Sequence, residues 1–209
     1  MTAAGLITAG LFFFLSQAKP VHTLSPHAPP HSVFASSVLT SILGQFVIHL
    51  LCLFTVLALC EHYEMYGVDM EASPESLSGY AQHMYERQHH RRINIPDSAF
   101  QPTLMNSAIY ILSLVIQTNN FVVNYRGEPF TQNLSDNKQL LMSVRTIYFV
   151  IFVVLSDVFE PLNDLLELEK FPCYEFQYIL GMILVFNLAS CWCVERLCQK
   201  WEVSVAASK

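Results

Sequence analysis

Hydrophobic residues of this 209-residue chain come in long blocks that are separated by polar segments. Four blocks are long enough for membrane-spanning helices, which need about 20 apolar residues to cross a hydrocarbon core of about 30 Å. They run over Val33–Leu59, Leu104–Val123, Leu140–Val158 and Phe176–Val194. Blocks that are apolar over such a length are not typical of half-exposed surface helices. The pattern therefore predicts an all-α fold, a polytopic bundle of transmembrane helices.

A fifth and shorter apolar block, Ala3–Leu15, precedes these four. Its thirteen residues are too few for a full span. Ser16-Gln17-Ala18 resembles a signal-peptide cleavage site, but no Lys or Arg precedes the block, and a signal peptide carries positive charge there. We favour the end of a helix whose first half lies upstream of Met1, with a signal peptide as the alternative. The predicted bundle has four full spans plus one truncated N-terminal span.

Lysine and arginine are distributed unevenly between the two sides of the predicted bundle. One side, which includes the first part of the third block, carries seven Lys/Arg, and the other carries four together with thirteen acidic residues. Loops that face the cytosol carry an excess of Lys and Arg. We therefore expect the first side and the C-terminus to be cytosolic; this side comprises residues 17–32, 125–139 and 195–209.

The composition narrows the functional classes further. Only 13% of the residues are charged, about half the usual share, and the net charge is −6, which excludes a disordered chain and a nucleic-acid binder. The six cysteines include no C-x-x-C pair. The sequence contains no phosphate-binding loop, nucleophile elbow, H-E-x-x-H or dinucleotide motif either. We predict no catalytic, cofactor-binding or metal-binding residue in this chain.

Polar residues inside the apolar blocks are the best candidates for function, because each costs free energy in a membrane unless it faces a partner or water. Gln117, Asn119 and Asn120 lie together in the second block. Gln117 and Asn120 are three residues apart and share a helix face, which Asn124 continues. One interpretation is a polar substrate cleft, and the other, which we favour, is hydrogen bonding between helices.

Two further groups have plainer interpretations. Gln45 and His49 are four residues apart on one face of the first block, where we favour helix packing. His83, His89 and His90 suggest a metal site or a pH sensor. They adjoin three arginines, which repel a cation, so a solvated loop is favoured. A short helix is one interpretation of Ser76–Gln88 in the same loop.

Several motifs resemble a known family. Ser16-Gln17-Ala18-Lys19-Pro20 is followed by Leu24-Ser25 and Pro29. Phe100-Gln101-Pro102-Thr103-Leu104-Met105-Asn106 opens the second block, and Asn124-Tyr125-Arg126-Gly127-Glu128-Pro129-Phe130 and Asn137-Lys138 follow it. In this order the motifs resemble the A branch of the type V P-type ATPases, the transmembrane-helix translocases of the endoplasmic reticulum.

The resemblance implies a part of the membrane domain and gives each segment a place. The segments are the end of core helix six (1–16), a Pro-rich cytosolic linker (17–32), helix seven (33–60), a lumenal loop (61–102), helix eight (103–124), a cytosolic loop (125–139), helix nine (140–158), a lumenal loop (159–175), helix ten (176–200) and a cytosolic tail (201–209). The resemblance therefore implies that the chain is the C-terminal support part of an ATP-driven pump that extracts mistargeted transmembrane helices.

The resemblance also implies what the chain lacks. The family phosphorylates an aspartate in a D-K-T-G motif with ATP and Mg²⁺, and no such motif is present here. We expect that the chain is not competent alone, so its classification as an enzyme stays open. The implied partners are the bilayer, the missing N-terminal part of the pump and transmembrane-helix substrates. The alternatives are a free-standing four-span scaffold or assembly protein and, less favoured, a carrier or channel that uses the polar residues of the second block.

Overall fold

The computed structural model describes residues 2–21, 34–66, 103–128 and 131–207. Their regular structure is helical, and an isolated bridge between Pro20 and Thr131 is the one β-type pairing recorded among them. The helices are α1 (Thr2–Ser16), α2 (Ser36–Tyr66), α4 (Leu104–Asn124), α5 (Lys138–Leu155), α6 (Glu160–Leu165) and α7 (Tyr174–Ala207). The predicted all-α fold is confirmed for these residues.

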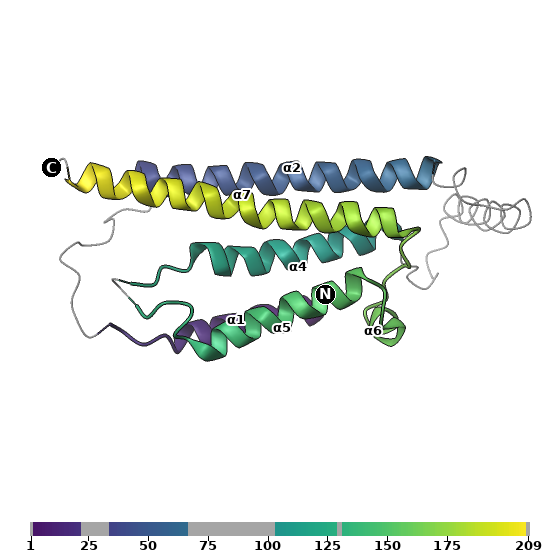
Figure 1. The fold of residues 1–209 in the computed structure, drawn as a ribbon, viewed down its shortest axis with the longest axis horizontal. Helices are drawn as coiled ribbons and strands as arrows, with labels where there is room; N and C mark the ends of the chain where they lie inside the picture. The colour runs from purple at the N-terminus through teal and green to yellow at the C-terminus, as the bar shows by residue number, and fades with distance from the viewer. Residues whose placement is uncertain (1, 22–33, 67–102, 129–130, 208–209) are drawn as a thin grey trace, which may run out of the picture.

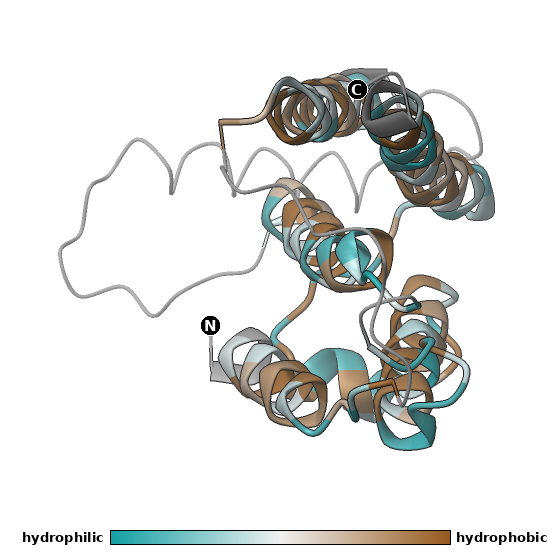
Figure 2. Cartoon of the chain, turned by 90° about the vertical axis from the view of Figure 1, so that its left-hand side faces the viewer, coloured by the Kyte–Doolittle hydropathy of each residue, from teal (hydrophilic) through white to brown (hydrophobic). Residues whose placement is uncertain are grey.

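The five longer helices form a bundle around α4. α2 and α7 lie side by side along the long axis of the molecule, and α4 packs against both of them (Figure 1). α5 packs against α4 on the other side, and α1 packs against α5 and α4 (Figure 2). The helix that carries Gln117, Asn119 and Asn120 is therefore the one that touches every other long helix.

Three of the four predicted spans are apolar and long enough to cross a membrane, counting only the residues that the structure describes. They are Ser36–Tyr63, Lys138–Leu155 and Tyr174–Ser204. α4 has 21 residues and a length of roughly 30 Å, which also suits a span. Its asparagines and Gln117 make it less apolar than the other three, so α4 is a helix of spanning length in the centre of the bundle.

Two helices continue beyond the predicted spans. α2 runs on to Tyr66, and α7 continues through the predicted tail to Ala207. Neither extension contains Gly or Pro, the two residues that most often end a helix. The predicted loop 159–175 contains the short helix α6. The segment Ser76–Gln88 and the three histidines near it lie outside the described residues.

Two side chains cap helices within the segments that carry the family resemblance. Thr103 caps α4, because its Oγ1 accepts a hydrogen bond from the backbone N–H of Asn106 at 3.2 Å. Asn137 caps α5 in the same way through the N–H of Leu140 at 3.2 Å. The Nδ2 of Asn137 also donates to the carbonyl oxygen of Phe14 at 3.2 Å, so this residue ties the end of α1 to the start of α5.

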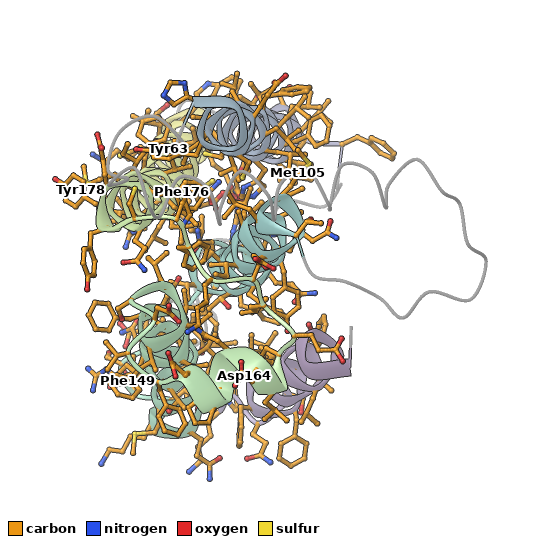
Figure 3. The ribbon with its side chains drawn as sticks, turned by 90° about the vertical axis from the view of Figure 1, so that its right-hand side faces the viewer. Tyr63, Met105, Phe149, Asp164, Phe176 and Tyr178 are labelled. Carbon is orange, nitrogen blue, oxygen red and sulfur yellow. The ribbon has the colours of Figure 1, made fainter. Side chains whose placement is uncertain are left out.

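Aromatic and apolar side chains fill the spaces between the helices. Tyr63 of α2 and Phe176 of α7 meet edge to face, with ring centroids 5.3 Å apart, at one end of the α2–α7 pair (Figure 3). Phe12 of α1 and Phe121 of α4 meet in the same geometry at 4.8 Å. The second contact shows that α1 lies beside the α4 face that carries Phe121.

Candidate polar site in the bundle

A directional chain of hydrogen bonds crosses the bundle from α5 to α2. Tyr148 of α5 donates its hydroxyl proton to Asn119 Oδ1 at 2.6 Å, and Asn119 Nδ2 donates to Asn187 Oδ1 at 2.9 Å. Asn187 Nδ2 lies 3.0 Å from His49 Nδ1, and His49 Nε2 lies 3.2 Å from Asn120 Oδ1. We call these five residues the polar chain; they connect α5, α4, α7 and α2.

The partners of His49 fix its protonation in this arrangement. An amide nitrogen such as Asn187 Nδ2 can only donate, so His49 Nδ1 accepts. An amide oxygen such as Asn120 Oδ1 can only accept, so His49 Nε2 carries the proton. The imidazole is therefore neutral, and every donor of the polar chain points the same way. Asn119 and Asn187 are completely buried, which makes each of their hydrogen bonds important for the bundle.

A second polar cluster surrounds Glu195 of α7, whose side chain is 95% buried. The hydroxyl of Ser41 donates to Glu195 Oε2, and Gln199 Nε2 donates to Oε1 at 2.9 Å. Arg126, which follows α4, places Nη2 3.7 Å from Glu195 Oε1 and 3.2 Å from Glu202 Oε2. The carboxylate is thus paired with a cation and hydrogen-bonded, as a buried charge requires.

Gln45 joins the cluster to α4. Its Nε2 donates to Asn124 Oδ1 at 2.9 Å and to Ser41 Oγ at 2.9 Å, and its Oε1 accepts from Asn124 Nδ2 at 3.1 Å. The two amides therefore form a reciprocal pair between α2 and α4. This pair and the cluster around Glu195 hold three helices together near the end of the bundle where α2 begins.

A cavity of about 590 Å³ lies beside both groups of polar residues. Its polar wall combines His49 and Asn120 of the polar chain with residues of the Glu195 cluster. The complete lining is Val38, Ser41, Ile42, Gln45, Phe46, His49, Asn120, Asn124, Arg126 and Glu195. One cavity, which we call the polar cavity for these groups although most of its wall is apolar, therefore reaches from Arg126, beyond the end of α4, to the imidazole of His49.

The three candidate residues from the sequence lie on one face of α4, next to this cavity. Asn120 and Asn124 are exposed on the surface of the chain and hydrogen-bond to α2. Gln117 is half-buried, and its Oε1 is buried without a hydrogen-bond partner among the described residues. The structure thus brings two of the three into contacts between helices. The predicted substrate cleft stays a prediction.

Sequence reasoning placed less weight on the residues that prove most buried. Asn119 belongs to the predicted polar group but proves to be its most buried member, and Glu195 lies on the predicted cytosolic side but proves to be buried. A signal for Glu195 exists in the spacing. Ser41, Gln45 and His49 recur every four residues, as do Asn187, Cys191 and Glu195, so each set forms a polar stripe on one helix face.

A second cavity, of about 460 Å³, lies between α5 and α7 and is almost entirely apolar. Tyr148, the first donor of the polar chain, is part of its wall, together with Val115 of α4 and Gly181 of α7. The polar chain therefore runs from a wall of this apolar cavity to a wall of the polar one. Among the described residues, no group of three His, Cys, Asp or Glu side chains could hold a metal ion.

Comparison with known proteins gives close matches along the chain, although no family model matches it. The chain is 31% identical over 202 residues to the endoplasmic reticulum transmembrane helix translocase of Schizosaccharomyces pombe, covering 96% of this chain and 14% of that protein. It is 33% identical over 201 residues to the probable manganese-transporting ATPase PDR2 of Arabidopsis thaliana, with the same two shares. The translocase of Saccharomyces cerevisiae is 28% identical over 197 residues.

These matches confirm the resemblance that the sequence motifs indicated. The similarity extends over nearly the whole chain, whereas the chain spans only about one seventh of the length of the curated relatives it matches. It is therefore similar to a segment of these P-type ATPases and not to a complete one.

Proposed function

We propose, on the premise of this similarity to a segment of endoplasmic reticulum translocases, that the chain is the C-terminal support part of the membrane domain of an ATP-driven pump. In this role α2, α4, α5 and α7 are four spans that hold the moving helices of the pump in place. The chain itself contains no phosphorylation motif. ATP and Mg²⁺ would act in the remainder of the protein, and the present residues would bind neither.

The observation that carries this proposal is the open polar face of α4, which we define as Ser113, Gln117, Asn120 and Asn124. Ser113, Asn120 and Asn124 are exposed on the surface of the chain. The face lies between Asn120, which contacts α2, and Phe121, which contacts α1. The views of Figures 1 and 2 agree that α2 and α1 lie on opposite sides of α4. α2 contacts this face without burying it, because Ser113, Asn120 and Asn124 stay exposed among the described residues.

A polar face of this kind is unfavourable against lipid. Asn120 and Asn124 hydrogen-bond to α2 but stay exposed, and Gln117 Oε1 has no partner among the described residues. Hydrocarbon offers no hydrogen bonds, so exposed amides cost free energy in it. The outward faces of α2, α5 and α7 differ, because they present Phe46, Phe149, Phe152 and Phe186, which suit lipid. We infer that another membrane helix with polar side chains covers the open polar face. In the proposed pump, that helix belongs to the part of the membrane domain that precedes this chain.

The bundle is built to resist deformation, as a support part requires. The polar chain and the Glu195 cluster tie four helices together with hydrogen bonds between buried groups. The excess of Lys and Arg supports a cytosolic C-terminus. The translocase names of the relatives support a location in the endoplasmic reticulum and transmembrane helices as substrates of the whole pump.

The size of the native protein tests the proposal. An antibody against residues 201–209 should detect, in native membranes, a band several-fold larger than 23.8 kDa, because the relatives are about seven times longer than the matched segment. Disruption of the codons for α4 should remove that band, which controls for cross-reaction. A sole specific band near 23.8 kDa would contradict the pump and favour a free-standing membrane scaffold.

A further inference from the structure

The polar chain is a two-state element, because its three hydrogen bonds between Tyr148 and His49 can also form in the opposite direction. In the structure all donors point from Tyr148 towards Asn120, and His49 accepts at Nδ1. A protonated imidazole carries a proton on both nitrogens and can only donate. His49 Nδ1 would then face Asn187 Nδ2, another donor, at 3.0 Å. The present arrangement is therefore incompatible with a charged His49.

Rotation of two amide groups relieves this conflict. If Asn187 turns its amide over, Oδ1 accepts from His49 and Nδ2 points to Asn119. If Asn119 turns as well, its Oδ1 accepts from Asn187 and its Nδ2 donates to the Tyr148 hydroxyl, which can accept. The contacts along the chain are kept, and their direction is reversed. The Tyr148 hydroxyl proton loses its acceptor and becomes free to turn towards the apolar cavity between α5 and α7.

We propose that His49 is a proton-binding site, and that binding of one proton from water in the polar cavity reverses the hydrogen bonds as far as Tyr148. An N–H bond forms at Nδ1, one O–H bond of a hydronium ion in the cavity breaks and leaves a water molecule, and no other covalent bond changes. Histidine is the side chain suited to this, because its charge normally changes between pH 5 and 8. The polar chain would carry the change across α4, from the polar cavity on one side to the apolar cavity on the other.

The groups around His49 fit a site that accepts a proton. On α7, Cys191 Sγ lies 3.9 Å from Nδ1, and Glu195, one turn further, lines the same cavity. On α4 the facing side chains are the neutral amides of Asn120 and Asn124, and the cation Arg126 follows the helix. Arg126 is itself paired with Glu195 and Glu202. Tyr148 is the titratable group that α5 contributes.

Nuclear magnetic resonance on the complete chain in lipid nanodiscs, with ¹⁵N-labelled histidine, tests the site. At pH 8 the His49 signal, assigned by its loss in His49→Gln, should show one protonated nitrogen, Nε2. At pH 5 both nitrogens should be protonated. In the control His62→Gln, at the far end of α2, the His49 signals should titrate as in the wild type. A His49 that stays neutral down to pH 5 overturns the proposal.

The reversal has its own readout at Tyr148. The infrared difference spectrum between pH 8 and pH 5 should contain a tyrosine C–O band that is lost in Tyr148→Phe. The same band should be lost in His49→Gln and in Asn187→Leu, because both interrupt the polar chain. Persistence of the band in both variants would show that Tyr148 responds independently of His49, and would overturn the coupling.

Discussion

Gly44 of α2 lies directly against Val194 of α7. A Cβ atom built on Gly44 would be 2.9 Å from Val194 Cγ1, closer than two such carbons approach in proteins. The absence of a side chain at Gly44 thus sets how closely α2 and α7 pack. Small residues let membrane helices approach in this way. The same approach brings the polar stripe of α2 next to that of α7, so the geometry of the polar site depends on this contact.

Gly44→Ala should therefore destabilise the bundle by about 1–3 kcal/mol, because the added methyl group meets the stiff side chain of Val194. Gly10→Ala in α1 is the matched control, since nothing lies within 4 Å of its Cβ position. This control should be neutral or stabilising by up to about 1 kcal/mol. Unfolding of the purified chain in mixed micelles measures both. Recovery of stability in Gly44→Ala/Val194→Ala would confirm the contact, and equal effects at Gly44 and Gly10 would contradict it.

Replacement of Asn187 by leucine should weaken the bundle by about 0.6–1.7 kcal/mol, the range of hydrogen bonds between membrane helices. The substitution removes the partners of Asn119 Nδ2 and His49 Nδ1. Ser113→Ala is the control, because the Ser113 hydroxyl bonds to the carbonyl oxygen of Ile109 within its own helix. We expect a change within about 0.5 kcal/mol for this control. An Asn187→Leu variant as stable as the wild type would show that the polar chain contributes nothing to packing.

Glu195 and Glu202 both pair with Arg126, but their environments differ. Glu195→Gln turns one carboxylate oxygen into a donor facing Ser41 or Gln199, so we expect a loss of about 1–3 kcal/mol. Glu202 is more exposed, and Glu202→Gln should cost less than about 1 kcal/mol. Thermal unfolding of the two variants gives the comparison. A larger loss for Glu202→Gln would place the important ion pair at the end of α7 instead.

A surface ion pair near α6 gives a pH-dependent prediction. Lys170 Nζ lies 2.7 Å from Glu160 Oε1, and this hydrogen bond lowers the pKa of Glu160 and raises the pKa of Lys170. A lowered carboxyl pKa stabilises the fold above the unfolded pKa, and this contribution disappears as the pH falls through the folded pKa. The difference in Tm between wild type and Lys170→Gln should therefore be present at pH 6 and shrink as the pH falls below the ordinary carboxyl pKa and through the lowered pKa of Glu160.

That difference should be small, because both side chains are more than half exposed. The raised pKa of Lys170 also limits the stabilisation by this ion pair at high pH. Its contribution to the stability of the fold is lost there, because the ammonium group deprotonates as the pH rises through the folded pKa. A Tm difference that stays constant from pH 6 to pH 3 would show that the ion pair does not form.

The sequence predicts where the helices lie far better than it predicts which helices pack against one another. Length and apolarity are local properties, so α4 agrees with its predicted block to within a residue. Which face of α4 is buried could also be predicted in part. Leu104, Ala108, Ile111, Leu112 and Val115 recur at helical spacing, and Asn119 continues their stripe. That pattern places Asn119 in the core, opposite the face of Gln117 and Asn124.

The environment of Glu195 could not be predicted in the same way. A glutamate near the end of an apolar block is typical of the membrane interface, where it stays in water. Its burial depends on the pairing of α7 with α2, which puts Ser41 beside it, and on the loop after α4, which supplies Arg126. Both are contacts between segments far apart in the chain. No local pattern states which helices become neighbours.

The central claim, that the open polar face of α4 packs against another part of a larger membrane domain, can be tested by photo-crosslinking in native cells. A photoreactive amino acid introduced at Gln117 by codon replacement should form protein crosslinks within the native membrane. The same residue at Phe152, on the exposed apolar face of α5, should react with lipid. Crosslinks at position 117 that map by mass spectrometry to a membrane helix upstream of this chain are the predicted result. Exclusive reaction with lipid at both positions would contradict the account.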